Sequence, residues 1–385
     1  MRKIVKVAFL PATVAGHPIA LAEQVAELGY AVRLWQLEVN PFGYGANQAI
    51  FQPKDRFLMR EFKRIKSLVQ VVTWADAIHC TFGSTLAPNS NLASSSKRWS
   101  LTNFRIRILR IYERSFFIFE LKAYQLSKKK VVLDYQGDDI RQRSFQIENY
   151  KHSIAHVVNE GYYTLEADSR KIKRLELFKK SQFWIQALNP DLLNYLPKEA
   201  EFVPYSNVEL NPTKSIKRPP TQLPYVFVHA PSNRAVKGTE SIIEVFSELK
   251  AEGIPVELKL VEGLKNDEAI RIYGQAFMAI DQLNAGWYGG FAVECMAQGV
   301  PVIAYIREED LIFIPNRMKS ELPISNACIC NLKNEILRLI EMSSNEYEKL
   351  SQKSLDFVHA WHDPQTIASE VIKKYLQKPI QVKNV

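Results

Sequence analysis

GWYGGFAVECMAQGVPVIAY, residues 286 to 305, is the stretch that indicates the fold most directly, because it joins a glycine turn, a short helix and a buried strand. Gly289 and Gly290 permit a positive φ or a close approach of the backbone to another group. Residues 291 to 298 predict a helix that Gly299 ends, and residues 300 to 306 predict an apolar strand. Glycine-rich turns that lead into helices are common in α/β proteins.

The same stretch contains the elements of a ligand site. Glu294 falls one turn inside the predicted helix, where its carboxylate can accept hydrogen bonds from sugar hydroxyls. The free amides at the start of that helix favour an anion such as phosphate. A purely structural turn is the alternative interpretation of these residues.

Apolar runs of strand length alternate with helical stretches along the whole chain, which is typical of parallel sheets wound with helices. A length of 385 residues exceeds one ordinary core. The sequence therefore predicts an α/β protein with two Rossmann-like domains that face each other across a cleft. The expected strands are 4–10, 31–37, 77–82, 130–135, 183–188 and 201–205, then 225–229, 256–261, 277–283, 300–306 and 327–330.

The pattern fails between residues 207 and 224, where four prolines occur without an apolar period. We therefore predict a first domain over residues 1–207 and a second over 208–362. Asp363 and Pro364 are suited to begin a last helix, whose apolar stripe is Ile367, Val371, Ile372, Tyr375 and Leu376. That stripe needs a surface to cover, and we expect residues 363–385 to pack back on the first domain.

The pattern of cysteines and the hydropathy of the chain indicate the cellular compartment of the protein. The four cysteines form no CxxC pair, which favours reduced thiols over disulfides or a cysteine metal site. The N-terminal residues imitate a secretion signal, but Lys6, Pro11 and Pro18 interrupt the apolar stretch, so a first strand is the better interpretation. No run of eighteen apolar residues occurs. We expect a cytoplasmic protein.

Positive charge is concentrated in residues 51–130, which hold sixteen Lys or Arg against five Asp or Glu, within a total formal charge of +9. Aromatic and aliphatic residues are interleaved with these cations, as in RIRILRIYERSFFIF. Such a segment is suited to an anionic membrane surface, an anionic acceptor or nucleic acid. We expect an anionic membrane and a peripheral position on its inner face, because no recognised nucleic-acid motif accompanies the charge. Solvated helix faces are the alternative.

A second constellation, YVFVHAPSNRAVKGTESIIEVFSEL, spans residues 225 to 249. A buried strand is followed by a loop with Arg234, Lys237 and Gly238 before a helix. Ligands of open α/β sheets bind outside the carboxyl ends of the strands. Two cations at such an edge suit a diphosphate, although both are equally consistent with ordinary surface charges.

The two constellations together resemble the donor-binding domain of family 4 retaining glycosyltransferases, which have the two-Rossmann-domain glycosyltransferase-B fold. The resemblance extends to the first domain, where AIHCTFG, DYQGDDIRQ and ALNPDLLNYLP are similar to the bacterial polysaccharide and lipopolysaccharide branch of that family. It also implies a C-terminal helix that crosses back to the first domain.

On the donor side, the resemblance implies that Arg234 and Lys237 bind the diphosphate and that Glu294 binds the nucleotide ribose. The family has a first glutamate eight residues before the second, where this chain has Gly286. That role then shifts to backbone amides near residues 288–291 or is absent. The remaining donor-binding residues that we expect are Ser232, Asn233, Gly238, Tyr288, Gly289, Gly290 and Phe291.

On the acceptor side, the family often has His-Gly-Ser-Asp where this chain has Gln136-Gly137-Asp138-Asp139. Gln136 is able to hydrogen-bond a sugar but not to shuttle a proton. The two aspartates are suited to orient the acceptor or, alternatively, to cap a turn. His17 is expected in a loop that faces the cleft, although a core or turn role is equally consistent. The acceptor-binding residues that we expect are Gly16, His17, Gln136, Asp138, Asp139 and Arg141.

The resemblance implies transfer of a sugar from a UDP- or GDP-linked donor to a lipid-linked or polysaccharide acceptor, with retention at the anomeric carbon. Arg234, Lys237 and a helix N-terminus stabilise the leaving diphosphate, without a metal or other cofactor. No general base is evident, so the departing phosphate takes the acceptor proton. The alternatives are a sugar-nucleotide epimerase or a phosphorylase on the same fold, or a catalytically lapsed module that binds anionic glycan or nucleic acid.

Overall fold

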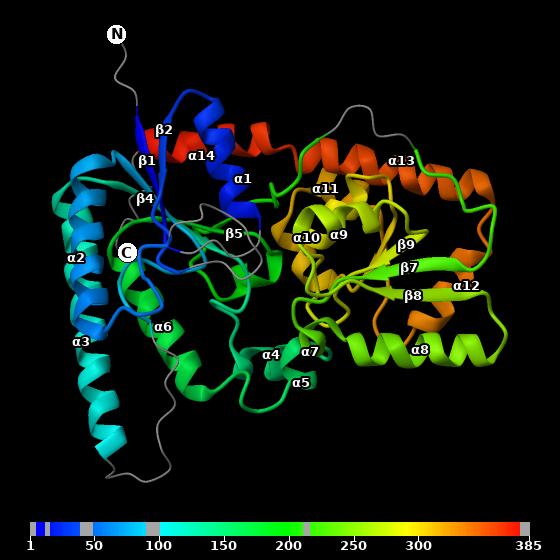
Figure 1. Ribbon diagram of the computed structural model, residues 1–385, viewed down its shortest axis with the longest axis horizontal. Helices are drawn as coiled ribbons and strands as arrows, with labels where there is room; N and C mark the ends of the chain where they lie inside the picture. The colour runs from blue at the N-terminus through cyan, green and yellow to red at the C-terminus, as the bar shows by residue number, and fades with distance from the viewer. Residues whose placement is uncertain (1–4, 12–15, 39–48, 90–100, 211–215, 378–385) are drawn as a thin grey trace.

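The computed structural model describes residues 5–11, 16–38, 49–89, 101–210 and 216–377. Its two parallel sheets lie side by side, each covered by helices (Figure 1). Residues of the expected segments that fall outside these ranges, such as Ile4 and the cations Lys97 and Arg98, lie outside the described structure. The predicted fold class, two Rossmann-like units, is confirmed.

The first sheet has the order β2-β1-β3-β4-β5-β6, and all of its strand pairs are parallel. Each of the six expected strands is present, although most are shorter than expected. The strands are β1 (Lys6–Leu10), β2 (Ala31–Leu34), β3 (Ala77–Cys80), β4 (Lys130–Tyr135), β5 (Trp184–Ala187) and β6 (Glu201–Phe202). Their helices are α1 (His17–Glu27), α2 (Phe57–Trp74), α3 (Leu101–Leu126), α4 (Arg143–Asn149), α5 (Ile154–Val157), α6 (Leu165–Lys180) and the 3₁₀ helix η1 (Pro190–Asn194).

The second sheet has the order β11-β10-β9-β7-β8, also parallel. The strands are β7 (Tyr225–His229), β8 (Val256–Leu260), β9 (Met278–Ile280), β10 (Val302–Ala304) and β11 (Ile324–Asn326). The helices are α7 (Arg234–Lys237), α8 (Thr239–Ala251), α9 (Asn266–Tyr273), α10 (Gly290–Met296), η2 (Glu308–Phe313), α11 (Asn316–Glu321), α12 (Leu332–Ile340), α13 (Ser344–Trp361) and α14 (Pro364–Leu376).

Two expectations for residues 327–330 are wrong. The last strand is Ile324–Asn326, so residues 327–330 form the turn that follows it. Within this turn Cys328 and Cys330 are joined by a disulfide, whereas we expected reduced thiols. The spacing of the cysteines did not reveal this disulfide, because two cysteines with one residue between them match no common metal-binding or redox motif. Cys80 and Cys295 are buried and free, as expected.

The last helix, α14, packs back on the first sheet. The side chain of Asp363 caps it by accepting a hydrogen bond from the Thr366 amide at 2.9 Å, and Pro364 occupies its first turn. Its buried stripe of Ile367, Ala368, Val371, Ile372 and Tyr375 meets residues of β1 and α1 in one apolar cluster. Leu376, which we assigned to this stripe, is instead 56% exposed. Figure 1 shows α14 in red beside the blue α1 and β1.

The opposite face of the first sheet is covered by α2, α3 and α6. Leu68 and Val71 of α2, Phe117 of α3 and Phe178 of α6 belong to the largest apolar cluster of this unit. Only one side of α2, the side that carries Leu68 and Val71, therefore packs against the sheet. No helix among the residues that the structure describes is long and apolar enough to cross a membrane.

Candidate functional site

The carboxyl ends of the strands in both sheets meet where the two units touch. From the first unit, His152 contacts the carbonyl oxygen of Leu283 at 2.8 Å through its Nε2. The short helix α5 packs there as well, since Ile154 and Ala155 share an apolar cluster with Ala285 and Val236. The segment that follows β4 thus lies against the loops that follow β7 and β9. This is the edge at which open α/β sheets bind ligands.

A buried ion pair lies at the end of β9. Lys237 is 9% exposed, and its Nζ lies 2.7 Å from Oδ1 of the fully buried Asp281. The other oxygen of Asp281 accepts a hydrogen bond from the Gly289 amide at 2.6 Å. Asp281 therefore joins the loop after β7 to the turn before α10. A Cβ at Gly289 would lie 3.3 Å from both Lys237 Nζ and Asp281 Oδ2, so this position has little room for a side chain.

Local structure explains why Lys237 points to this place. The side chain of Asn233 caps α7 by accepting a hydrogen bond from the Val236 amide at 3.1 Å. Gly238 ends the helix at φ +79°, a left-handed conformation that glycine adopts without strain. The short α7 therefore holds Lys237 at its last position, facing Asp281. Sequence analysis placed Asp281 inside a strand and did not identify it as a site residue. The signal that could have identified it is a polar residue directly after an apolar run.

Glu294 lies in α10, next to this ion pair, and is 9% exposed. Its Oε1 accepts hydrogen bonds from the side-chain amides of Asn207 and Asn266, each at 3.2 Å. Burial raises the pKa of the Glu294 carboxyl to about 7, although the two amides act in the opposite direction. Sequence analysis did not identify Asn207 or Asn266, because neither stands near a recognisable motif.

Arg234 does not share the environment of Lys237. Its guanidinium makes a two-pronged contact with Glu262, with distances of 2.9 Å from Nε and 2.7 Å from Nη2, and Nη1 donates to Glu240 at 2.8 Å. These hydrogen bonds raise the pKa of Arg234 further above its usual value. The two expected diphosphate ligands are therefore on one short helix, but each has its own acidic partner.

The other expected donor residues fall into two groups. Ser232 is exposed in the loop before α7, and Gly290 begins α10, where a Cβ would meet Asn207 Nδ2 at 3.0 Å. The side chain of Tyr288, in contrast, is fully buried, and its hydroxyl contacts His362 Nε2 at 2.9 Å. Phe291 packs edge-on against Tyr273. The structure thus brings the backbone of residues 288–291 to the site, but not the Tyr288 ring.

Gly286, which stands where the family has a carboxylate, faces the guanidinium of Arg307. Gly286 has φ +83°, and a Cβ there would lie 2.5 Å from Arg307 Nη1 and 2.6 Å from Cζ. The backbone amide of Arg307 also donates to the Gly286 carbonyl at 3.0 Å. A side chain at position 286 is therefore disfavoured twice, by the backbone conformation and by the position of Arg307.

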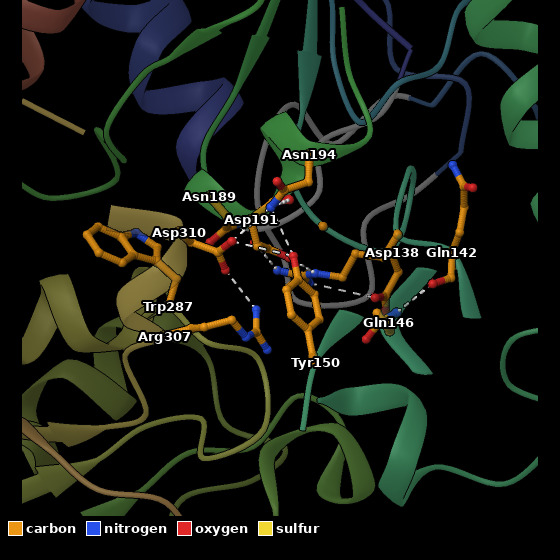
Figure 2. Close-up of polar contacts among 12 residues, drawn as sticks. Asp138, Gln142, Gln146, Tyr150, Asn189, Asp191, Asn194, Trp287, Arg307 and Asp310 are labelled. Atoms are coloured by element: carbon orange, nitrogen blue, oxygen red, sulfur yellow. Dashed lines mark hydrogen bonds and ion pairs between the residues drawn. The ribbon is translucent and has the colours of Figure 1, made fainter. Parts of the chain in front are cut away.

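Arg307 belongs to a polar network that joins the two units (Figure 2). Its guanidinium lies 3.6 Å from the ring centroid of Tyr150 and pairs with Asp310 at 2.8 Å. Asp310 in turn accepts a hydrogen bond from Asn194 at 2.8 Å. Since Tyr150 and Asn194 follow β4 and β5, this network holds the first unit against the loop after β10. Sequence analysis did not identify any of these four residues.

On the acceptor side, Asp139 and Gln136 lie together after β4. One carboxylate oxygen of Asp139, Oδ2, accepts a hydrogen bond from the Gln136 amide at 2.9 Å, and Oδ1 accepts one from the Gly137 amide at 2.7 Å. Burial raises the pKa of Asp139 to about 7 despite these hydrogen bonds. The Gln136 side chain donates to Asp134 at 3.3 Å.

Asp138 and Arg141 are occupied by other partners. The carboxylate of Asp138 accepts hydrogen bonds from the hydroxyls of Tyr162 and Tyr163. Arg141 makes a buried two-pronged ion pair with Asp191, at 2.7 Å from Nε and 3.0 Å from Nη2. Both residues therefore hold the loops of the first unit in place through these contacts.

His17 is buried directly after Gly16, at the start of α1, where it borders Asp134. Its Nδ1 accepts a hydrogen bond from the Ser206 amide at 3.0 Å, and its Nε2 lies 3.5 Å from Asp134 Oδ2. Burial alone would raise the pKa of Asp134, but contacts with His17 and His79 lower it to about 2. The structure thus places His17 next to the Gln136 loop through a shared carboxylate. No group of three or more His, Cys, Asp or Glu side chains suited to a metal ion occurs among the described residues.

No family model matches the sequence, and no curated protein matches it. Solved glycosyltransferases nevertheless share the fold over almost the whole chain. A sucrose-phosphate synthase from Thermosynechococcus elongatus has a TM-score of 0.58 at 14% identity, covering 97% of this chain and 99% of that one. WaaG, a glycosyltransferase involved in lipopolysaccharide biosynthesis, has a TM-score of 0.53 at 10% identity, covering 95% and 99%. An alpha-glucosyltransferase in complex with UDP and a 13-mer DNA has a TM-score of 0.56 at 12% identity, covering 97% and 99%.

Proposed function

We propose that the chain is a retaining glycosyltransferase of the family 4 type, which moves a sugar from a UDP- or GDP-linked donor to a lipid-linked or polysaccharide acceptor. The observation that carries the proposal is the pairing of Lys237 and Asp281 beside Glu294, where the strand ends of the two sheets meet. A buried cation and a buried carboxyl at the edge of a Rossmann-like sheet suit a nucleoside diphosphate. The shared fold with solved glycosyltransferases, one of them in complex with UDP, supports it.

The residues of this site have separate tasks in the proposal. Lys237 receives the diphosphate, which competes with Asp281 for the ammonium group. Glu294 accepts hydrogen bonds from the ribose hydroxyls. We assign this role to it because the hydrogen bonds that its carboxylate accepts in the structure come from weak donors, the side-chain amides of Asn207 and Asn266. Arg234 reaches the diphosphate only after leaving Glu262 and Glu240, so we assign it to charge neutralisation during the reaction.

The reaction separates charge between a developing oxocarbenium ion and the departing diphosphate. Groups that are attracted more strongly to the transition state than to the bound donor lower the barrier. Lys237 and Arg234 supply this positive charge, so the proposal assigns no metal cofactor. The departing phosphate takes the acceptor proton on the same face of the sugar, and retention follows. Asp139 and Gln136 orient the acceptor hydroxyl from the opposite unit.

Donor turnover and transfer test the proposal directly. Glu294→Ala and Lys237→Ala are expected to lose at least about tenfold in transfer of the sugar, since each removes a charged contact with the donor. Glu294→Gln and Lys237→Gln are the more conservative changes, and thermal melting verifies that each variant is folded, because Lys237→Gln removes the partner of the buried Asp281. Wild-type rates in all four variants would contradict the assignment.

The same assay separates the alternatives. Conversion of the donor sugar without an acceptor would indicate an epimerase, and release of a sugar phosphate with inorganic phosphate would indicate a phosphorylase. Binding without turnover of any donor would indicate a lapsed module, for which the lack of a carboxylate at Gly286 is the supporting observation.

We also propose that the enzyme lies on the inner face of an anionic membrane through α2 and α3. The outer sides of these helices, which we call the α2–α3 surface, carry Leu58, Phe62, Ile65 and Val69 on α2 and Phe104, Ile108, Ile111 and Phe119 on α3. Each of these eight side chains is between 49% and 80% exposed. The exposed cations Lys66, Arg105, Arg107, Arg114 and Lys122 lie on the same two helices. Exposed apolar stripes flanked by cations suit an anionic lipid surface.

A further inference from the structure

A hollow of about 380 Å³ lies between α2 and the open edge of the first sheet. This volume falls within the range of small-molecule sites. The hollow is remote from the strand ends that form the proposed donor site, because Lys6 is the first residue of β1. Its lining residues are Lys6, Arg33, Trp35, Gln70, Thr73 and Trp74.

Strand register explains why these side chains surround a space. Lys6 pairs with Ala31 and Ala8 pairs with Arg33, so the four side chains project from the same face of the sheet, together with Trp35. The two alanines fill little of the volume beneath Arg33. On the helix side, Gln70, Thr73 and Trp74 form one edge of α2, at spacings of three and four residues.

The charged groups of two cations at this hollow have no acidic partner within the described part of the chain, although the backbone amide of Lys6 donates to Asp76 at 3.1 Å. Among the described residues, no carboxylate pairs with the Lys6 ammonium group or with the Arg33 guanidinium, and Arg33 makes only a contact 4.5 Å above the Trp74 ring. Elsewhere in the described chain, several cations are paired with carboxylates, as Lys63 is with Asp55 and Lys237 with Asp281. An unneutralised pair of cations favours a carboxylate or phosphate group as ligand.

The aromatic and polar side chains favour a sugar as the carrier of that anionic group. Trp35 and Trp74 lie 5.5 Å apart with their planes tilted by 53°, so they do not form a parallel slot for a flat nucleobase. The hydroxyl of Thr73 donates to the Val69 carbonyl at 2.8 Å, which leaves its lone pairs to accept from a ligand hydroxyl. The Gln70 amide is exposed and offers both donors and an acceptor.

We infer that this hollow binds an anionic saccharide, a sugar unit with a carboxylate or phosphate, held by Lys6 and Arg33 and packed against Trp74. The inference does not depend on the proposed transfer reaction, because no residue of the hollow belongs to the donor or acceptor site. Where both hold, the hollow retains a part of an acidic glycan that is distant from the reacting end.

Titration of the intact protein with four probes, followed by tryptophan fluorescence and by calorimetry, tests the inference. The probes are tetragalacturonate, glucose 6-phosphate, the neutral maltotetraose and the oligonucleotide (dT)8. Tetragalacturonate or glucose 6-phosphate is expected to bind at least about tenfold more tightly than maltotetraose, and more weakly as salt is raised. The tighter of the two identifies carboxylate or phosphate as the preferred anion.

The variants Lys6→Gln and Arg33→Gln are each expected to weaken that binding by about tenfold, since each removes one charge-assisted contact. Lys353→Gln, at an exposed lysine of α13, serves as the control and is expected to bind like the wild type. Glu294→Gln is also expected to bind these probes normally, which separates this site from the donor site. Thermal melting verifies that the variants are folded. Lys6→Gln is expected to disturb the structure less than Arg33→Gln, because Arg33 also contacts Trp74.

Three results would overturn the inference. The first is equal affinity for the anionic probes and for maltotetraose. The second is unchanged binding in folded Lys6→Gln and Arg33→Gln. The third is binding of (dT)8 without binding of either anionic sugar. The last result would assign the hollow to nucleic acid instead.

Discussion

Lys237 and Glu294 are neighbours in the candidate donor site, but the protein controls their charges differently. Lys237 is neutralised by Asp281 at 2.7 Å, whereas Glu294 has only neutral amide partners. The buried carboxyl therefore changes its charge near neutral pH, since burial raises its pKa to about 7. A donor whose ribose hydroxyls donate to Glu294 would stabilise its charged form.

The variant Glu294→Gln tests this arrangement through stability. A folded-state pKa above the ordinary value of 4.5 means that the folded protein binds the extra proton more tightly. The contribution of Glu294 to stability is therefore complete below pH 4.5 and is lost as the pH rises to about 7. We expect Glu294→Gln to melt at a higher temperature than the wild type at pH 8, with the difference absent or reversed at pH 5.

Asp139 titrates in the same range and in the same direction, so some pH dependence persists in this variant. Glu308→Gln, at an exposed glutamate, is the matched control and is expected to follow the wild type at both pH values. A melting temperature for Glu294→Gln below that of the wild type at pH 8 would argue against a destabilising buried charge.

Gly286 provides a second test at the level of single residues. Gly286→Ala and Gly253→Ala both place a Cβ at a positive φ, +83° and +78° respectively. Only position 286 adds a steric conflict, because nothing lies within 4 Å of a Cβ at Gly253. We expect Gly253→Ala to lower the free energy of unfolding by about 1 kcal/mol and Gly286→Ala by at least about 1 kcal/mol more, measured by urea denaturation. Equal losses would show that Arg307 moves aside freely.

At the level of secondary structure elements, sequence periodicity predicted ten of the eleven strand segments because buried parallel strands are continuous apolar runs. The exception is β11, where ISN contains two polar residues and the more apolar AC that follows forms a turn. α14 was predicted from its cap and stripe, and it packs where expected. Leu376 was assigned wrongly because its helix ends there, beyond the edge of the sheet.

The α2–α3 surface was visible in the sequence as positive charge interleaved with aromatic and aliphatic residues. That pattern does not show which apolar residues of each helix face the core. In α2 the stripe with Leu68 and Val71 is buried, and the one with Phe62 and Ile65 is exposed. An exposed apolar stripe contributes little to the stability of the fold, and we propose that it contacts the membrane.

Flotation with liposomes tests this surface. We expect the wild type to float with anionic vesicles and not with neutral ones, and the double variant Phe62→Ser/Ile65→Ser to lose at least half of that binding. Its melting temperature should not change, since the two side chains are 64% and 49% exposed. Ile312→Ser, at a 78% exposed residue of η2 in the second unit, is the matched control. Equal flotation with both kinds of vesicle would remove the membrane proposal.

At the level of the whole molecule, the sequence predicted two parallel sheets but not how their loops combine. Asp281, Asn207 and Asn266 converge on the proposed donor site from three separate segments, and no spacing rule links them. The same holds for the network of Tyr150, Asn194 and Arg307, which exists only once the two units are in contact. Local motifs therefore identified Lys237 and Glu294, whereas their partners depend on tertiary packing.

The arrangement of the whole molecule also explains the absence of a carboxylate at position 286. Arg307 occupies the space of that side chain while it stacks on Tyr150 from the other unit. The space beside Gly286 is thus occupied by a side chain that contacts the other unit. The resemblance to family 4 glycosyltransferases implies a carboxylate at this position, and in the structure Arg307 lies where its Cβ would be.

Calorimetric titration with UDP, GDP, ADP, CDP and dTDP is the measurement that tests the central claim most directly, namely that Lys237, Asp281 and Glu294 form a nucleoside diphosphate site. We expect UDP or GDP to bind the wild type, and to bind Lys237→Gln at least about tenfold more weakly. Lys250→Gln, at an exposed lysine of α8, should bind like the wild type. No binding of any of the five nucleotides, or equal binding by wild type and folded Lys237→Gln, would contradict the account.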